Sequence, residues 1–480
     1  MLRPLLTLPF AFFILSCSSS VTYDTVIANG RVMDPESGLD AVLHVGIEDG
    51  KVAILSKNEI TGKKVLDASD HVVTAGFIDL HRHGHSPDNY RAQIHDGITS
   101  TLELEIGVED ITSFYSEREG TSILNYGAAI SHAYSRNIIM TGSNPGLTGE
   151  ALLQPLTGNQ LKALEQHITD ALNRGAVAVG FGLAYSPGAT STELLTIFEL
   201  AKKFEANCHV HIRTSRTDAS NVDEVLQYSK QSGAALHIVH INSSGAKLIP
   251  LYLETITKAR QAGIDVTTEV YPYNRGSTFI ESHLFDDWET YSDEKIGQHI
   301  FVETGENLNR KSFAHYREKG GLLITQPAYS MEMLSTAIAS PLTMIASDGM
   351  WLDKGRAHPR TFGTYARTLS HYVREQQVLS LMDALSKMSL QPARRLERRV
   401  PLMKNKGRVR VGADADLVVF NPETVIDKGT FENPAQYPEG IRHVLVNGAA
   451  VLIESEIVKG VFPGRAIRGP MKEMRIMQGY

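Results

Sequence analysis

Two histidines placed two positions apart are the first feature of the chain that could do chemistry. His81 and His83 end the apolar run GFIDLHRH, and in a strand alternate residues face the same side, so both imidazoles can reach one ion. Other polar residues end further apolar runs, namely Glu103, Glu105, His209, His211, His240 and Asp348. Imidazole and carboxylate ligands without a thiolate are typical of catalytic zinc sites that leave one position for water. The spacing therefore predicts a zinc centre, with one or two ions per chain.

The runs that carry these residues alternate with helical stretches along most of the chain. There are eight such runs: GFIDLHRH, ITSTLELE, ILNYGAAI, AVAVGFGL, CHVHIR, LHIVHIN, DVTTEVYPY and TMIASDG. Helical segments such as TGNQLKALEQHITDALNRG fall between consecutive runs, which is the pattern of βα units around a parallel sheet. We predict an α/β fold with a TIM-like (β/α)8 barrel over residues 76–400, whose strand ends meet at one mouth and build the active site.

Both ends of the chain show the pattern of short antiparallel strands. Residues 21–75 alternate apolar and polar positions around the turn signals Asn29-Gly30 and Asp49-Gly50, and residues 401–470 repeat this style around Asn447-Gly448. We expect the two ends to pair into one small β-sandwich, followed by a tail at 471–480.

The first twenty residues predict export. MLRPLLTLPFAFFILSC has an early cation and an apolar stretch too short to span a bilayer, and its end resembles the lipobox of bacterial lipoproteins. In that interpretation residues 1–20 are signal and tether, and an acylated Cys17 anchors the protein to a membrane on the periplasmic side or the cell surface. An ordinary signal peptide or a simple apolar terminus is the alternative. Cys208 would be the remaining cysteine, so no intrachain disulfide is expected.

Composition narrows the class of partner. The chain has 480 residues, 42% of them hydrophobic, and a formal net charge of −7. A chain of this length and apolar content can bury one large core and a smaller one. Its mild negative charge lacks the basic patch typical of a nucleic-acid-binding protein. A small-molecule substrate is expected, and the sequence predicts no particular oligomeric state.

A family resemblance rests on longer strings. The His-x-His strand, His211, His240, ASDG at 346–349 and GRVRVGADADLVVF resemble the amidohydrolase superfamily. Within it, GLAYSPG, HIR, DVTTEVYPY and HPRTFGTYARTLSHYVRE resemble the N-acyl-D-amino-acid deacylases, or D-aminoacylases.

The resemblance implies roles for individual residues. His81 and His83 match one metal pair, and His211 and His240 match the ligands of the tighter zinc. Asp348 matches the catalytic acid/base, Arg360 matches the arginine that holds the substrate carboxylate, and two aromatic residues match positions lining the substrate pocket, Tyr185 and Tyr271.

Two positions depart from the family pattern. Where D-aminoacylases have a cysteine ligand after the second barrel strand, this chain has TLELEIGVED, so a glutamate must substitute; Glu105 is preferred, with Glu103 on the same face as the alternative. Asn242 stands where the family has a lysine near the substrate.

The sequence as a whole predicts a metal-dependent hydrolase that removes the acyl group from N-acyl-D-amino acids. The alternatives are an amidohydrolase acting on cyclic amides, isoaspartyl or D-peptides, or N-acetyl amino sugars, and a lipoprotein that binds ligands without catalysis.

Overall fold

The protein is described by a computed structural model that places residues 21–215 and 217–472. The predicted signal peptide and tether, with Cys17, lie outside the described residues, as does most of the predicted tail. In the described part of the chain, no helix combines the length and apolar character needed to cross a membrane.

The predicted α/β barrel is confirmed. Within the described residues, one sheet of eight strands runs parallel in the order β16-β12-β11-β10-β9-β8-β7-β6. Its strands are β6 (Phe77–Asp79), β7 (Ile98–Val108), β8 (Asn125–Ser131), β9 (Ala178–Gly182), β10 (Asn207–His211), β11 (Ala235–Ile238), β12 (Val266–Val270) and β16 (Thr343–Ile345). Just beyond the two outer strands, the backbone of Arg82 pairs with that of Gly349, and His83 N donates to Gly349 O at 2.9 Å, which brings the first and last strands together.

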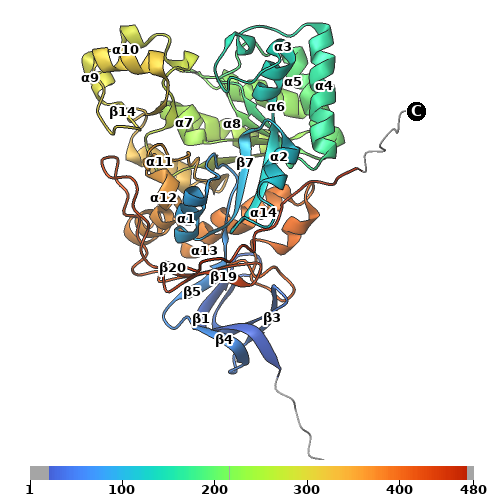
Figure 1. Cartoon of the computed structure of the whole chain (residues 1–480), viewed down its shortest axis with the longest axis vertical. Coiled ribbons are helices and arrows are strands. Elements are labelled where there is room, and N and C mark those ends of the chain that lie inside the picture. Colours follow the sequence, from blue (N-terminus) through green and yellow to red (C-terminus); the bar gives the residue numbers. More distant parts are fainter. Residues whose placement is uncertain (1–20, 216, 473–480) are drawn as a thin grey trace, which may run out of the picture.

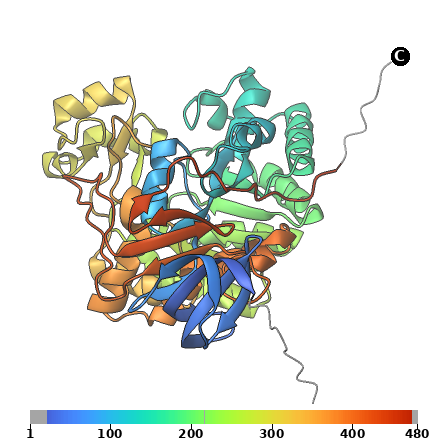
Figure 2. The ribbon, with the colours of Figure 1, turned by 60° about the horizontal axis from the view of Figure 1, so that its bottom comes forward.

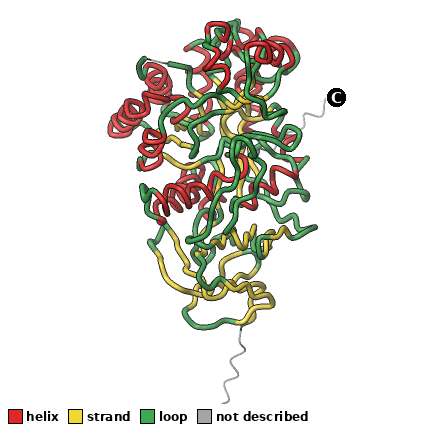
Figure 3. Tube along the Cα trace, turned by 90° about the vertical axis from the view of Figure 1, so that its left-hand side faces the viewer, coloured by secondary structure: helices red, strands yellow, loops and turns green. Residues whose placement is uncertain are grey.

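Helices surround this sheet (Figure 3). They are α1 (Pro87–His95), α2 (Ile111–Ser116), α3 (His132–Thr141), α4 (Gly158–Asn173), α5 (Ser191–Lys203), α6 (Ser220–Ser232), α7 (Ile241–Gly245), α8 (Ile249–Gln261), α11 (Met331–Ala339), α12 (Arg360–Arg367), α13 (Leu381–Leu385) and α14 (Gln391–Leu396).

Helix α4 shows how the sequence forms them. Thr157 and Gln160 make a capping box at its start, in which the Gln160 side chain accepts a hydrogen bond from Thr157 N at 2.9 Å. Leu164, Ile168 and Leu172 then repeat every four residues, so one stripe of the helix is buried in the core between the helices and the sheet.

The two ends of the chain pair, as expected, but they build one mixed sheet where an antiparallel β-sandwich was predicted. Its strands β1 (Thr22–Asp34), β2 (Leu39–Glu48), β3 (Lys51–Ser56), β4 (Thr61–Asp67) and β5 (Val72–Ala75) come from one end, and β17 (Leu417–Phe420), β18 (Ile441–Val446), β19 (Ala449–Ile453) and β20 (Glu456–Ile457) from the other. Strand β1 runs parallel to β4 and β5. The antiparallel pair β5–β17 joins the halves, so that the blue and red strands of Figure 2 lie side by side. This sheet forms the end of the molecule opposite most helices (Figure 1).

One of the three predicted turns is wrong. Asp49-Gly50 and Asn447-Gly448 do connect antiparallel strands with positive φ at both residues, as a hairpin turn requires. Asn29, with φ 63°, instead lies inside β1, where the register to β2 shifts between Ile27 and Gly30. Asn29 is left-handed there but Gly30 is not, so the pair lacks the two positive φ angles of a hairpin turn and forms a bulge instead.

A small insert lies between the last two barrel strands. It contains a three-stranded sheet of β13 (Ser277–Phe279), β14 (Ile300–Phe301) and β15 (Leu322–Ile324), with helices α9 (Asp293–Gly297) and α10 (Arg310–Lys319). Its own apolar cluster includes Ile280, Phe301 and Phe313. The insert stands beside the barrel mouth, at the upper left of Figure 1.

Candidate metal centre and active site

The carboxyl ends of the barrel strands bring the predicted polar residues to one place. His81 and His83 follow β6, Glu105 lies in the second half of β7, His211 ends β10, His240 follows β11, and Asp348 follows β16. The close approach of β9 to β7 depends on a glycine, because a Cβ on Gly180 would lie 2.4 Å from Glu105 O. Parallel topology therefore gathers side chains that are up to 267 positions apart in the chain.

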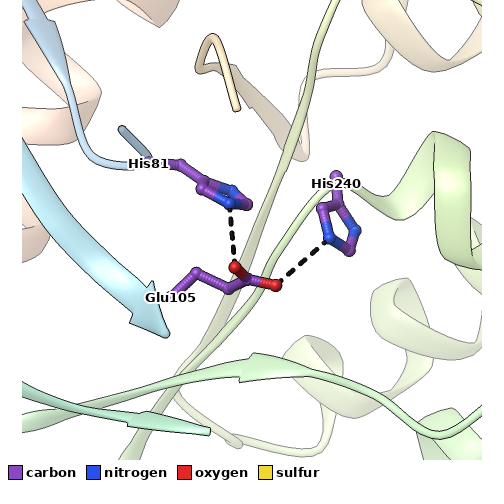
Figure 4. Close-up of side chains that lie close together, drawn as sticks. All are labelled: His81, Glu105 and His240. Atoms are coloured by element: carbon purple, nitrogen blue, oxygen red, sulfur yellow. Dashed lines mark ion pairs between the residues drawn. The ribbon is translucent and has the colours of Figure 1, made fainter. Parts of the chain in front are cut away.

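Glu105 is the centre of the cluster. Its Oε2 lies 3.2 Å from His81 Nε2 and 3.3 Å from His83 Nε2. Its Oε1 lies 2.6 Å from His211 Nδ1 and 3.5 Å from His240 Nε2. Figure 4 shows the carboxylate between His81 and His240. One carboxylate thus connects the two histidine pairs.

Glu103 has a different position. Its Oε2 lies 2.8 Å from His83 Nδ1, on the side of the ring away from Glu105, and its Oε1 accepts a hydrogen bond from Gly107 N. The pairing of β7 with β8 is irregular between Glu103 and Val108, which lets the two glutamates reach opposite sides of the same imidazole. From their spacing in the sequence, either Glu103 or Glu105 could have been the metal ligand. The structure places Glu105 between the two histidine pairs, which supports the preference for Glu105.

Asp348 completes the cluster. Its Oδ1 lies 3.4 Å from His81 Nε2 and 3.5 Å from His83 Nε2. Two sets of side chains bring their ligand atoms within 4.8 Å of one another: His81, His83 and Asp348, and His81, Glu105 and His240.

The histidine tautomers show that these residues fit a metal ion. Nδ1 of His81 lies 2.6 Å from a carboxylate oxygen of Glu269, and Nδ1 of His83 lies 2.8 Å from Glu103, so each Nδ1 carries a hydrogen. The two Nε2 atoms then face each other at 3.1 Å with their lone pairs. A cation between them resolves this contact, and imidazole and carboxylate donors are ligands that zinc accepts.

The electrostatics of the site favour ionised carboxylates. Burial would raise the pKa of Asp348, but the Arg360 guanidinium opposes this effect and the pKa is lowered. Burial likewise opposes ionisation of Glu105, yet the hydrogen bonds from His211 and His240 help to keep its pKa well below the usual range. Both groups are therefore anionic at neutral pH, which is the form that binds a cation.

Two of the cluster residues hold a backbone conformation that L residues rarely adopt. His240 has φ 29° and Asp348 has φ 49°. The turn at Asp348 is held by its neighbour, because Ser347 N donates to the buried Asp79 carboxylate at 3.0 Å. Such strain costs about 1–3 kcal/mol per residue and is concentrated at functional sites.

The predicted substrate residues are placed in two groups. Tyr185 lines the cavity above the cluster, and its hydroxyl lies 2.8 Å from Thr278 Oγ1. Tyr271, Asn242 and Arg360 are buried beside the cavity and are not among its lining residues. Asn242 Nδ2 donates to the hydroxyl of Tyr329 at 2.6 Å and to Tyr271 O at 3.2 Å, so it ties the barrel to the chain that follows the insert.

Arg360, the first residue of α12, is fully enclosed. Its Nη2 forms an ion pair with Asp348 Oδ1 at 2.9 Å, and its guanidinium lies 4.5 Å from the centre of the Tyr271 ring. None of its three side-chain nitrogens makes a hydrogen bond to the described residues. A buried guanidinium with free donors is costly unless a ligand supplies acceptors.

The cavity over the cluster has a volume of about 340 Å³. Apart from the cluster, its wall combines hydroxyl groups with large apolar side chains, among them Ile106, Tyr134, Leu284, Phe285, Phe279 and Trp351. The rings of Phe279 and Trp351 lie 5.4 Å apart at the insert, and Trp351 is 36% exposed.

Sequence reasoning missed several of these residues. Phe279 and Phe285 belong to the insert, whose strands of two or three residues show no periodicity. Glu269, in DVTTEVYPY, could have been noticed as a carboxylate in a buried strand, although its partners come from other strands.

Comparison with known proteins gives consistent matches. A family model described as "Amidohydrolase family" matches residues 331–452. The chain is 30% identical to an N-acyl-D-glutamate deacylase of Alcaligenes xylosoxydans xylosoxydans over 93% of this chain and 96% of that protein. It is 25% identical to a D-aminoacylase of the same organism, over 94% and 99% of the two chains.

A solved structure is similar over nearly the whole chain. The N-acyl-D-glutamate deacylase of Bordetella bronchiseptica, complexed with zinc and a phosphonate inhibitor, superposes with a TM-score of 0.79 at 25% identity, covering 94% of this chain and 100% of that one. A D-hydantoinase shares the fold, with a TM-score of 0.64 at 16% identity over 93% and 99% of the chains.

Proposed function

Because the chain belongs to the D-aminoacylase family of the amidohydrolase superfamily, we propose that it is a zinc-dependent hydrolase that removes the acyl group from N-acyl-D-amino acids. The observation that carries the proposal is the convergence of four imidazoles and two carboxylates from five strand ends, all of which line one cavity except the buried His81.

The chain provides ligands for up to two ions. His81, His83 and Asp348 would hold one ion. Glu105 and His240, with His211 beside Glu105, would hold the other, and Glu105 also reaches His81 and His83. A zinc ion supplies an electrophile for the amide carbonyl and lowers the pKa of water to about 7, so that it becomes a nucleophile at neutral pH.

Asp348 serves as the acid/base. Its carboxylate is ionised at neutral pH, lines the cavity and is fixed by Arg360 and by the turn at Ser347. It takes a proton from the attacking water at Oδ1 or Oδ2 and returns it to the nitrogen of the departing amine, because an amide nitrogen leaves poorly until it is protonated.

We assign the substrate carboxylate to Arg360, which lies behind Asp348 and outside the residues that line the cavity, so the assignment requires this wall to open when the substrate binds. Its free guanidinium donors lie next to Asp348, and a planar fork of this kind matches a carboxylate through two parallel hydrogen bonds. The apolar residues of the cavity, with Phe279 and Trp351 at the insert, would accept the side chain or the acyl group.

A second candidate is hydrolysis of cyclic amides, isoaspartyl or D-peptides, or N-acetyl amino sugars. Two observations favour it: Glu105 stands where the family has a thiolate, and Asn242, in place of a lysine, is engaged with Tyr329 rather than with the cavity.

A substrate panel and one isosteric variant test the proposal. N-acetyl-D-amino acids should be hydrolysed, and their L enantiomers, hydantoins and N-acetylglucosamine 6-phosphate should not. Asp348→Asn should keep the ion held by Glu105, His211 and His240, weaken the position that Asp348 helps to form, and lose about 10²- to 10⁴-fold in kcat, the usual contribution of a positioned acid/base. Retention of most activity in this variant would remove the role of Asp348, and preference for hydantoins or amino sugars would favour the second candidate.

We also propose that the protein is exported and held at a membrane by an acylated Cys17. The support is the lipobox-like end of the first seventeen residues. In a bacterial host, the full chain should carry labelled palmitate and sediment with membranes, whereas Cys17→Ser should do neither. Equal label and sedimentation in both proteins would contradict the anchor.

A further inference from the structure

A buried carboxylate lies directly beneath the metal centre and is not one of its ligands. Glu269, on β12, is 1% exposed. Its Oε1 lies 2.6 Å from His81 Nδ1, and its Oε2 lies 3.0 Å from His237 Nε2. His237 Nδ1 in turn contacts Thr267 Oγ1 at 2.8 Å. The chain of contacts therefore runs from the cluster through one carboxylate into the centre of the barrel.

This contact determines which nitrogen of His81 can bind an ion. An ionised carboxylate only accepts hydrogen bonds, so the hydrogen of a neutral His81 must sit on Nδ1. The lone pair is then on Nε2, which faces Glu105 at 3.2 Å and Asp348 at 3.4 Å. Glu269 also fixes the ring plane, because at 2.6 Å a small rotation would break the bond.

Glu269 differs from the buried Glu193 in the cation that balances its charge. Glu193 is also 1% exposed and lies 2.8 Å from His132 Nε2, but it has an arginine, Arg136, as its counter-ion. For Glu269 the ion pairs in the described chain are with His81 and His237. An enclosed carboxylate without a permanent cation is costly, and a neutral residue could fill the same space.

We propose that Glu269 is a positioning residue that fixes the tautomer and orientation of His81, and thereby sets the metal affinity of the position formed by His81, His83 and Asp348. The inference rests on the proposed function, because it requires that the cluster binds metal. In the described chain, Glu105, His211 and His240 make no hydrogen bond or ion pair with Glu269 and are linked to it through His81, so the second position should depend on Glu269 far less.

Metal titration of the full chain tests this inference. Protein stripped of metal is titrated with Zn²⁺ against a chromophoric chelator, and with Co²⁺ while the visible absorption bands are followed. In Glu269→Gln, which keeps the volume and one acceptor, the tighter equivalent should bind as in the unchanged protein. The weaker equivalent should lose about 10- to 100-fold in affinity, and its Co²⁺ bands should change, as is usual when the partner of a metal-binding histidine is removed.

Two further variants keep the test decisive. Glu269→Asp retains the charge but is shorter by one methylene, so it should weaken the same equivalent even if Glu269→Gln does not fold. Glu193→Gln is the matched control, a buried glutamate paired with histidine away from the cluster, and should change neither equivalent.

The outcomes separate the inference from the proposed function. Equal affinity of both equivalents in all variants, or parallel loss of both together with a lower unfolding temperature, would overturn the positioning role. Failure of the unchanged protein to bind Zn²⁺ or Co²⁺ would instead overturn the proposed function.

Discussion

Replacing Arg360 separates two roles that the structure places on one side chain. The guanidinium pairs with Asp348 at 2.9 Å, and its nitrogens make no hydrogen bonds to the described residues. Arg360→Lys keeps a positive charge for Asp348 but loses the planar fork. Arg360→Met removes both.

The expected magnitudes follow from these contacts. Hydrogen bonds from a charged donor contribute about 1.5–3 kcal/mol, so Arg360→Lys should lower kcat/KM for N-acyl-D-amino acids by roughly 10- to 150-fold. The corresponding primary amides cannot use the fork and should change by less than about threefold, which is under 1 kcal/mol. Arg360→Met leaves Asp348 buried without its cation, a loss of about 3–5 kcal/mol of stability, and should impair both substrate types.

The assay compares initial rates on matched acid and amide substrates for the three proteins, with the unfolding midpoint measured for each. Equal losses on acid and amide in Arg360→Lys would refute the assignment of the substrate carboxylate to Arg360. The arginine would then act through Asp348 alone.

Three further predictions concern stability and selectivity. Burial lowers the pKa of Lys387 from 10.5 to about 8 against the opposing effect of Asp383, so the folded chain binds fewer protons than the unfolded chain in this range. Through Lys387 the free energy of unfolding should therefore rise by about 3 kcal/mol as the pH increases from about 8 to 10.5, and it should not change through this group below pH 8. In denaturant titrations Lys387→Met should lack this rise. The same pH dependence in both proteins would contradict the prediction. Zinc present at 1,000 times its Kd stabilises the folded state by about 4 kcal/mol, so removing it with a chelator should lower the unfolding midpoint by the corresponding amount. An unchanged midpoint would exclude a metal bound in the folded state. Trp351→Ala should lower kcat/KM for N-benzoyl substrates about tenfold more than for N-acetyl substrates, which corresponds to about 1.5 kcal/mol of lost contact with the larger acyl group. An unchanged ratio of the two kcat/KM values would place the acyl group elsewhere.

Much of the barrel and the cluster could be predicted because both follow from simple periodicities. Parallel strands buried on both faces appear as short apolar runs, and their carboxyl ends share one edge, so a histidine or acid at the end of each run is brought to the same mouth. The positive-φ pairs Asp49-Gly50 and Asn447-Gly448 likewise marked true hairpins.

Other features depend on contacts that no local pattern encodes. Glu103 and Glu105 share one strand face by spacing, and the irregular pairing of β7 places them on opposite sides of His83. Asn29-Gly30 has the sequence of a turn, but tertiary pairing makes it a bulge. The enclosure of Arg360 and the link from Glu269 to His81 join residues that are far apart in sequence, and only the closed barrel brings them together.

Zinc titration of activity tests the central claim most directly. Metal-stripped protein is assayed with N-acetyl-D-methionine and its L enantiomer while zinc is added in known equivalents. The account predicts that turnover of the D substrate rises with zinc occupancy and that the L substrate remains intact. Turnover that is independent of zinc, or none on any N-acyl-D-amino acid at full occupancy, would contradict it.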